Sequence, residues 1–289
     1  MLQSKCLICE SNNIRRMEGY HSPQLLKCGH CGFVFCEEVP SVDALTSYYA
    51  TYGAEHYLSP ITTARYNEWL DKFEKYRNTG NILDIGCGSG FFLAEAKKRG
   101  WNVFGTEYSD VHVERCRSTG INMWKGGVET FMFPGIEFDI ITSIEVIEHI
   151  NNPLHEMQII SSKLRSGGLF YCTTPNFNAL SRFLLGPKYN IISYPEHLSY
   201  YTRSTLNKLC AGFQLKKLKS ETTGISITRF NQSNGKTDQA VISATSDDEL
   251  IRNRIEGSAL LRLLKRLVNS LLQITGLGYS LKAWFIKQG

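Results

Sequence analysis

Residues 81–92 read N-I-L-D-I-G-C-G-S-G-F-F, and this stretch constrains the fold more than any other. Residues 81–85 form a short apolar run interrupted by one carboxylate, Asp84, which is typical of a buried parallel strand. Glycines follow at 86, 88 and 90, and residues 91–99 have helical spacing with basic residues in the last turn. A strand, a turn that lets the backbone approach a ligand, and a helix whose N-terminus points at that ligand predict a nucleotide-type site.

A second acid strengthens this prediction. The next apolar run, residues 101–107, ends in Glu107, roughly twenty residues after the glycines, where an acid meets a ribose diol. The combination resembles the class I S-adenosylmethionine (SAM)-dependent methyltransferases, whose α/β, Rossmann-like sheet is mostly parallel with helices on both faces. In that family the D-x-G-x-G-x-G segment wraps the methionine part of the cofactor, and the acid binds the ribose hydroxyls. The resemblance assigns these cofactor roles to Asp84, Gly86, Gly88, Gly90 and Glu107. The alternative is that the glycines mark only a tight strand-to-helix turn.

Two C-x-x-C knuckles near the N-terminus predict a structural zinc ribbon. They are separated by eighteen residues, the spacing of paired zinc knuckles. Tetrahedral zinc needs four ligands, and each knuckle supplies two thiolates from one tight turn. The segment between the knuckles is polar, so metal would supply folding energy. The predicted ligands are Cys6, Cys9, Cys28 and Cys31, with His30 and Cys36 as spare candidates.

Length and composition bound the remaining possibilities. The 289 residues can hold one large domain and a small one. A formal net charge of +5 allows an anionic partner but does not demand nucleic acid. We find no signal-peptide pattern and no apolar stretch long enough to span a membrane. The nine cysteines then favour a reducing cytoplasm and metal ligation over disulfides.

The order of the patterns predicts four regions. Residues 1–39 form the ribbon and 40–78 an aromatic and helical connector, with a helix over 64–76. The SAM-binding domain covers 79–230, with further strands over 121–124, 138–144, 169–174, 213–220 and 225–230 and a candidate lid over 178–194. Residues 231–289 form a polar loop (233–248) followed by C-terminal amphipathic helices. Tyrosines at 48, 49, 52 and 57 either roof a pocket or pack the ribbon against the main domain.

Residues after the fourth predicted strand of the SAM-binding domain carry the candidate chemistry. Glu145, Glu148 and His149 lie on one face if a helical turn begins there, and His197 follows in P-E-H-L-S-Y-Y. This set resembles the metal site of small-RNA 3′-terminal 2′-O-methyltransferases, and E-x-x-E-H segments occur in ubiquinone-pathway O-methyltransferases. Three alternatives remain: a divalent metal (Mg²⁺, Mn²⁺, Fe²⁺ or Zn²⁺) that activates a substrate hydroxyl, a metal-free base at His149 or His197, or a pocket-shaping role. His155 falls on another face and is expected to be exposed.

An apolar stripe near the C-terminus has helical spacing: Leu260, Leu264, Leu267, Leu271 and Ile274. Basic residues lie off this stripe. We expect the helix to pack on its own domain or on a second copy of the chain. The alternative is peripheral membrane contact through residues 258–286, which Trp284 and Phe285 favour.

The motif order resembles bacterial SAM-dependent methyltransferases that carry an N-terminal zinc ribbon, many of which act on sugars in surface-polysaccharide or secondary-metabolite pathways. The resemblance implies O-methylation of a sugar or similar small polar metabolite. Alternatives are 2′-O-methylation of an RNA 3′ end, C- or N-methylation of a sugar, and a non-catalytic adaptor that grips a partner through the ribbon. No basic patch lies beside the site, which argues against nucleic acid. The sequence does not indicate an oligomeric state.

Overall fold

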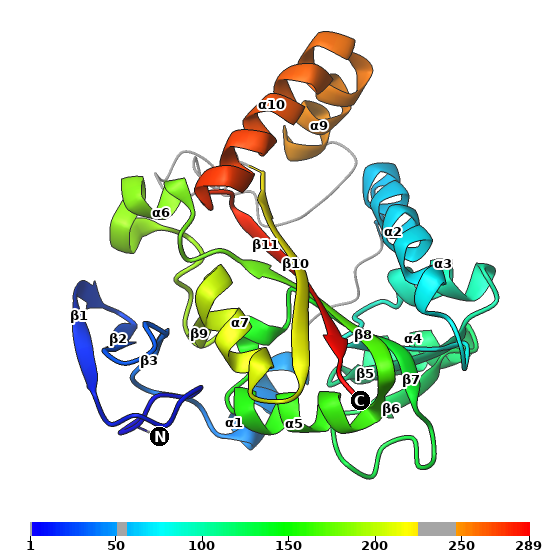
Figure 1. The fold of residues 1–289 in the computed structure, drawn as a ribbon, viewed down its shortest axis with the longest axis horizontal. Helices are drawn as coiled ribbons and strands as arrows, with labels where there is room; N and C mark the ends of the chain where they lie inside the picture. The colour runs from blue at the N-terminus through cyan, green and yellow to red at the C-terminus, as the bar shows by residue number, and fades with distance from the viewer. Residues whose placement is uncertain (1, 51–56, 225–246) are drawn as a thin grey trace.

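The computed structural model describes residues 2–50, 57–224 and 247–289 (Figure 1). The main sheet has seven strands, and neighbouring strands follow the order β10-β11-β8-β7-β4-β5-β6. All neighbours from β8 to β6 pair in parallel, whereas β11 is antiparallel to both β8 and β10. The strands are β4 (Asn81–Ile85), β5 (Asn102–Glu107), β6 (Asn122–Lys125), β7 (Phe138–Ile144), β8 (Leu164–Pro175), β10 (Leu215–Thr223) and β11 (Ser280–Lys287).

Helices cover both faces of this sheet, as the predicted fold class requires. One core lies under α2 (Pro60–Phe73) and α3 (Phe91–Lys98), where Leu70, Phe73 and Leu93 are fully buried. The opposite core lies under α5 (Pro153–Lys163) and α7 (Arg203–Ala211). The helix α4 (Asp110–Ser118) follows β5. The chain adds β5 and β6 on one side of β4 and then returns to add β7 and β8 on the other side, so the strand order reverses at β4. Open α/β sheets bind ligands in the crevice at the strands' carboxyl ends at such a point.

The N-terminal ribbon is fused to this domain through a second sheet. Its strands β1 (Ile14–His21), β2 (Gln24–Cys28) and β3 (Val34–Cys36) are antiparallel, and β3 pairs with β9 (Ser199–Tyr200) of the main domain. Buried Phe33 and Phe35 belong to the same core as α5 and α7. Lys208 on α7 also donates to the carbonyl oxygen of Cys31 at 3.1 Å. The ribbon therefore shares a sheet and a hydrophobic core with the main domain.

Shorter elements connect these layers. The connector holds α1 (Val42–Ala50), α2 and the 3₁₀ turn η1 (Glu74–Tyr76), and the candidate lid holds α6 (Leu180–Leu185) and η3 (Gly186–Lys188). The turn η2 (Ile147–His149) follows β7. Near the C-terminus, α9 (Asp247–Gly257) and α10 (Ala259–Thr275) form the helical pair at the top of Figure 1.

The C-terminal region differs from its prediction. Residues 280–287 form β11, which inserts between β8 and β10 in the main sheet, so the predicted boundary at 230 divides one sheet. Trp284 and Phe285 are buried in this strand and cannot serve as membrane anchors. The predicted strand over 225–230 lies outside the described residues, as does the predicted loop over 233–248 except for the start of α9. Among the described residues, no helix is long and apolar enough to cross a bilayer.

Candidate functional site

The glycine loop after β4 is built so that two of its glycines cannot be replaced without a clash. Gly86 and Gly90 have φ values of +62° and +73°, and Gly90 is the N-cap residue of α3. A Cβ on Gly86 would lie 2.7 Å from Cγ2 of Val146, and one on Gly90 would lie 2.6 Å from Sγ of Cys116. Gly88 also has a positive φ, +52°, but a Cβ there would meet nothing within 4 Å. The middle of the loop therefore faces open space at the crevice.

The two predicted cofactor acids lie beside this loop. Oε2 of Glu107 accepts a hydrogen bond from the backbone N–H of Gly88 at 3.0 Å, and Oε1 accepts from the N–H groups of Tyr108 and Ser109. Asp84 is buried and accepts a 2.6 Å bond from the hydroxyl of Thr142. Burial raises the pKa of Asp84 to about 7 against the lowering effect of this bond, and the charge of Glu107 raises it further. An acid in that range ionises readily when a cationic ligand approaches.

Three of the four candidate catalytic side chains converge. Glu148, His149 and His197 each offer one ligand atom, and these atoms lie within 4.8 Å of one another. Nε2 of His149 is 3.8 Å from Oε1 of Glu148, and the two imidazole centroids are 4.8 Å apart. The hydroxyl of Thr174 donates to Oε2 of Glu148 at 2.9 Å. Sequence positions 148 and 197 thus meet at the carboxyl end of β7.

Backbone carbonyls fix both imidazoles in the same tautomer. Nδ1 of His149 lies 2.7 Å from the carbonyl oxygen of Glu196, and Nδ1 of His197 lies 2.7 Å from that of Ile191. Because a carbonyl oxygen only accepts, each Nδ1 carries a proton, which leaves Nε2 as the ring atom of a neutral imidazole that can bind a metal. Burial, with His197 as the second cause, lowers the pKa of His149 to about 4. Neutral imidazoles held in this way are the form that binds metals.

Glu145 does not join this cluster, which corrects the predicted set of four. Glu145 is exposed, with a φ of +55°, and its backbone N–H donates to the carbonyl oxygen of Thr173 at 2.9 Å. The left-handed backbone at Glu145 interrupts any regular helical path before the η2 turn begins at Ile147. Glu145 and Glu148 therefore do not lie on one face of a helical turn. His155 is exposed, as expected.

Tyr49 reaches the cluster from the connector. Its hydroxyl oxygen lies 3.0 Å from Nδ1 of His149 and donates to the carbonyl oxygen of Glu196 at 3.3 Å. Its ring is also 6.3 Å from that of Tyr108, which follows Glu107. The sequence singled out this tyrosine only as one of four, and Tyr52 lies outside the described residues. Tyr49 thus borders both the glycine-loop side of the crevice and the histidine cluster.

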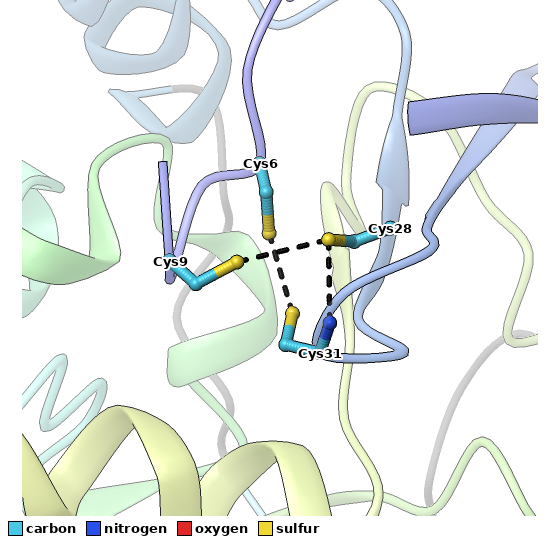
Figure 2. Close-up of side chains that lie close together, drawn as sticks. All are labelled: Cys6, Cys9, Cys28 and Cys31. Carbon is cyan, nitrogen blue, oxygen red and sulfur yellow. Dashed lines mark hydrogen bonds between the residues drawn. The ribbon is translucent and has the colours of Figure 1, made fainter. Parts of the chain in front are cut away.

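The four knuckle cysteines point their sulfurs at a common centre (Figure 2). Sγ atoms of Cys6 and Cys31 are 3.5 Å apart, and those of Cys9 and Cys28 are 3.7 Å apart. Tetrahedral zinc with Zn–S bonds of about 2.3 Å requires sulfurs about 3.8 Å apart. Although burial acts in the opposite direction, N–H groups of Cys31 and His30 lower the pKa of Cys28 to about 7. The tetrad fits a zinc ion, whereas Cys36 lies outside it.

Comparison with known proteins agrees with this geometry. The family model described as "Methyltransferase domain" matches residues 56–220. A ubiquinone biosynthesis O-methyltransferase from Ruegeria sp. (strain TM1040) is 32% identical over 107 residues, which are 35% of this chain and 43% of that protein. One from Roseobacter denitrificans is also 32% identical, with the same coverage. The chain thus spans less than half the length of these curated relatives.

Solved structures show the same fold. The crystal structure of a SAM-dependent methyltransferase from Archaeoglobus fulgidus has a TM-score of 0.52 at 18% identity, covering 78% of this chain and 93% of that chain. At this identity the likeness establishes the fold alone. The family model, in contrast, matches more than half of the 289 residues and contains both the glycine loop and the histidine cluster. This chain therefore belongs to the methyltransferase domain family and has the Rossmann-like methyltransferase fold.

Proposed function

We propose that this methyltransferase acts on a hydroxyl oxygen of a small polar acceptor, and that Glu148, His149 and His197 receive that oxygen. The observation that supports this assignment is the contact between the cluster's own segment and the cofactor loop. Val146, two residues before Glu148, packs directly against Gly86. An acceptor held at the cluster would then lie next to the cofactor expected on the glycine loop.

The chain's residues would act mainly by positioning. In this reaction the acceptor oxygen would bond to the methyl carbon of SAM as the carbon–sulfur bond breaks, S-adenosylhomocysteine would leave, and the hydroxyl proton would pass to water. Much of the barrier can be met by holding oxygen, carbon and sulfur in line. Tyr49 and the carbonyl oxygen of Glu196 fix His149 in place for this step. Glu107 and Asp84 would hold the ribose and methionine ends of the donor.

We also propose that the cluster holds a divalent cation through Glu148, His149 and His197. Such an ion lowers the pKa of a nearby hydroxyl and so favours its attack. The alternative, a histidine that accepts the proton without metal, is less suited to His149, because its lowered pKa disfavours the imidazolium. Zinc in the cysteine tetrad would have a separate, structural role.

A sugar-like molecule is the proposed acceptor, because the motif order resembles sugar-modifying methyltransferases. The curated relatives named for ubiquinone biosynthesis support a second candidate, a phenolic hydroxyl on a quinone precursor. Incubating the full chain with labelled SAM and parallel panels of nucleotide sugars, glycans and catechols decides between them. Label on an oxygen of either panel supports O-methylation. Label found only on carbon or nitrogen, or on none of the acceptors, would refute it.

The metal proposal has a test that does not depend on turnover. Mn²⁺ prefers carboxylate and imidazole ligands over thiolates. Its electron paramagnetic resonance signal therefore measures binding at the cluster, with no contribution from the cysteine tetrad. We expect one bound Mn²⁺ in the native chain and at least about tenfold weaker binding after Glu148→Gln, His149→Ala or His197→Ala.

Two matched variants serve as controls for that experiment. Glu145→Gln and His155→Ala change the same residue types at exposed positions outside the cluster, and we expect both to keep Mn²⁺ binding. Methyl transfer that survives EDTA in a chain with no bound Mn²⁺ would refute a catalytic metal. It would leave the metal-free base as the mechanism.

A further inference from the structure

The helix α10 carries an exposed apolar face along its whole length. Leu260 and Ile274, near its two ends, are 74% and 80% exposed, and the leucines between them on that face are more than half exposed. Seventeen residues at 1.5 Å each make a strip about 26 Å long. Soluble monomers rarely leave so continuous an apolar surface open. The residues of the face are Leu260, Leu263, Leu264, Leu267, Leu271 and Ile274.

The main domain contacts α10 through residues on another side of the helix. Gln273 accepts a 2.7 Å bond from the backbone N–H of Thr222 on β10, and Asn269 accepts a 2.9 Å bond from that of Gly224. Leu272 is the buried side chain of the helix. The apolar face is thus turned away from the sheet, contrary to the expectation that the stripe packs on its own domain.

A second exposed apolar group continues the surface at the C-terminal end of α10. The backbone N–H of Leu180, at the start of α6, donates to the carbonyl oxygen of Leu277 at 2.9 Å. Phe183 on α6 is 57% exposed and lines a pocket of about 290 Å³ together with Thr275 at the end of α10. Leu184, next on α6, is 67% exposed. Two segments far apart in the sequence therefore present apolar side chains at neighbouring positions.

The charged residues of α10, α6 and η3 are all basic. The helix α10 contains three basic residues, Arg262, Lys265 and Arg266, and no aspartate or glutamate. The elements α6 and η3 add Arg182 and Lys188 and contain no acid. Lys265 forms a 2.5 Å ion pair with Glu256 of α9, which leaves the surface with net positive charge. An apolar face combined with a net positive polar side is the arrangement that lies in the interface of an anionic bilayer.

We propose that α10 and the exposed residues of α6 dock this enzyme on the surface of an anionic phospholipid bilayer. The leucines and Ile274 of α10, with Phe183 and Leu184, would enter the boundary between headgroups and acyl chains. The arginines and lysines would attract the anionic headgroups. This docking does not depend on which acceptor the enzyme methylates.

The competing occupant is a second copy of the chain. The spacing of positions 260, 264, 267, 271 and 274 also suits helix pairing. The two occupants differ in their need for the basic residues. A bilayer uses their charge, whereas in a helix pair these residues lie away from the apolar seam and contribute little.

Co-sedimentation with vesicles tests the proposal. We expect the full chain to bind vesicles of phosphatidylcholine and phosphatidylglycerol and to bind phosphatidylcholine alone more weakly. The substitution pair Leu264→Ser/Leu267→Ser should lower the partition coefficient at least about tenfold, because it removes two large apolar side chains from the interface. Arg262→Glu/Arg266→Glu should lower binding to the anionic vesicles by a similar factor.

Matched control variants make the same kinds of substitution at exposed positions away from α10 and α6. Val111→Ser/Leu218→Ser takes away two exposed apolar side chains, and Lys216→Glu/Lys217→Glu makes the same change of charge on exposed β10 residues. We expect both controls to keep vesicle binding and all variants to keep SAM affinity. Absent binding to anionic vesicles, or equal loss in variants and controls, overturns the proposal. A lipid-independent dimer that dissociates with Leu264→Ser/Leu267→Ser overturns it in favour of a second copy.

Discussion

The thiol of Cys36 donates a hydrogen bond to the carbonyl oxygen of His197 at 3.4 Å, and the two residues are 161 positions apart in the chain. The backbone N–H of Cys36 also donates to the carbonyl oxygen of Leu198 at 2.9 Å. Cys36 ends β3, the ribbon strand that pairs with β9. The ribbon therefore fixes the backbone that carries one of the three clustered side chains, and its folding should influence that site.

Loss of the zinc ion that the cysteine tetrad would hold should weaken the histidine cluster without affecting the glycine loop. Replacing Cys9 with serine removes one of four sulfur ligands, so β3 should loosen and release residues 197–200. We expect Mn²⁺ affinity at the cluster to fall at least about tenfold, while calorimetry shows SAM affinity nearly unchanged. Hydrogen exchange at residues 197–200 should rise in the same variant.

Cys210→Ala provides the comparison for Cys9→Ser, because Cys210 is a buried thiol on α7 outside the tetrad. It should change neither Mn²⁺ affinity nor exchange at residues 197–200. Unaltered exchange there after zinc loss would show that the ribbon and the cluster are independent.

Gly88 offers a direct test of where the cofactor lies. Gly88→Ala places a methyl group where nothing lies within 4 Å, so its folding cost is only the strain of the positive φ, about 1–2 kcal/mol. If SAM approaches the loop backbone as expected, the added methyl group should lower SAM affinity at least about tenfold. Thermal unfolding and calorimetry measure the two effects separately.

Gly135→Ala is the matched control, since Gly135 has a φ of +72° and equally open surroundings but lies outside the loop. It should cost similar stability and leave SAM affinity unchanged. Equal SAM affinity in both variants would show that the cofactor does not contact Gly88.

Local patterns were sufficient to predict the strand, the glycine loop and the acid beside it. The strand β4, the glycine loop and Glu107 lie within 27 residues of sequence, and each has a short-range signature that the structure reproduces. The pairing of Glu148 and His149 with distant His197 came from the resemblance of the motifs. The same resemblance and the helical offset also included Glu145, which lies outside the group of three because its positive φ after β7 breaks the expected helical turn.

Long-range pairings could not be predicted in the same way. The strand β11 follows a helix and joins the sheet between strands that precede it by some sixty and more than a hundred residues in the chain. Its burial depends on those partners and not on its own composition. The pairing of β3 with β9, and therefore the contact between Cys36 and His197, has no local signal either. Exposure of the α10 stripe likewise depended on which side of the helix reaches β10.

Buried Glu156 on α5 should make the stability of the protein depend on pH. It is 6% exposed, and its Oε1 has no hydrogen-bond partner in the described structure. Burial raises the pKa of Glu156 to about 8, well above its value in an unfolded chain. The folded state therefore holds a proton that the unfolded state releases. The contribution of Glu156 to stability is complete at acidic pH and is lost as pH rises through 8, by up to about 1.4 kcal/mol per pH unit.

Glu156→Gln keeps the shape of the side chain and removes its ionisation, so we expect the variant to gain stability relative to the native chain as pH rises from about 5 to 8. Urea unfolding at several pH values measures this difference. Glu114→Gln is the control, because Glu114 is exposed and pairs with Arg117 at 2.7 Å, and it should not reproduce the rise. A stability difference that stays constant across this range would mean that Glu156 is already ionised in the folded protein, which requires a cation or water to reach Oε1.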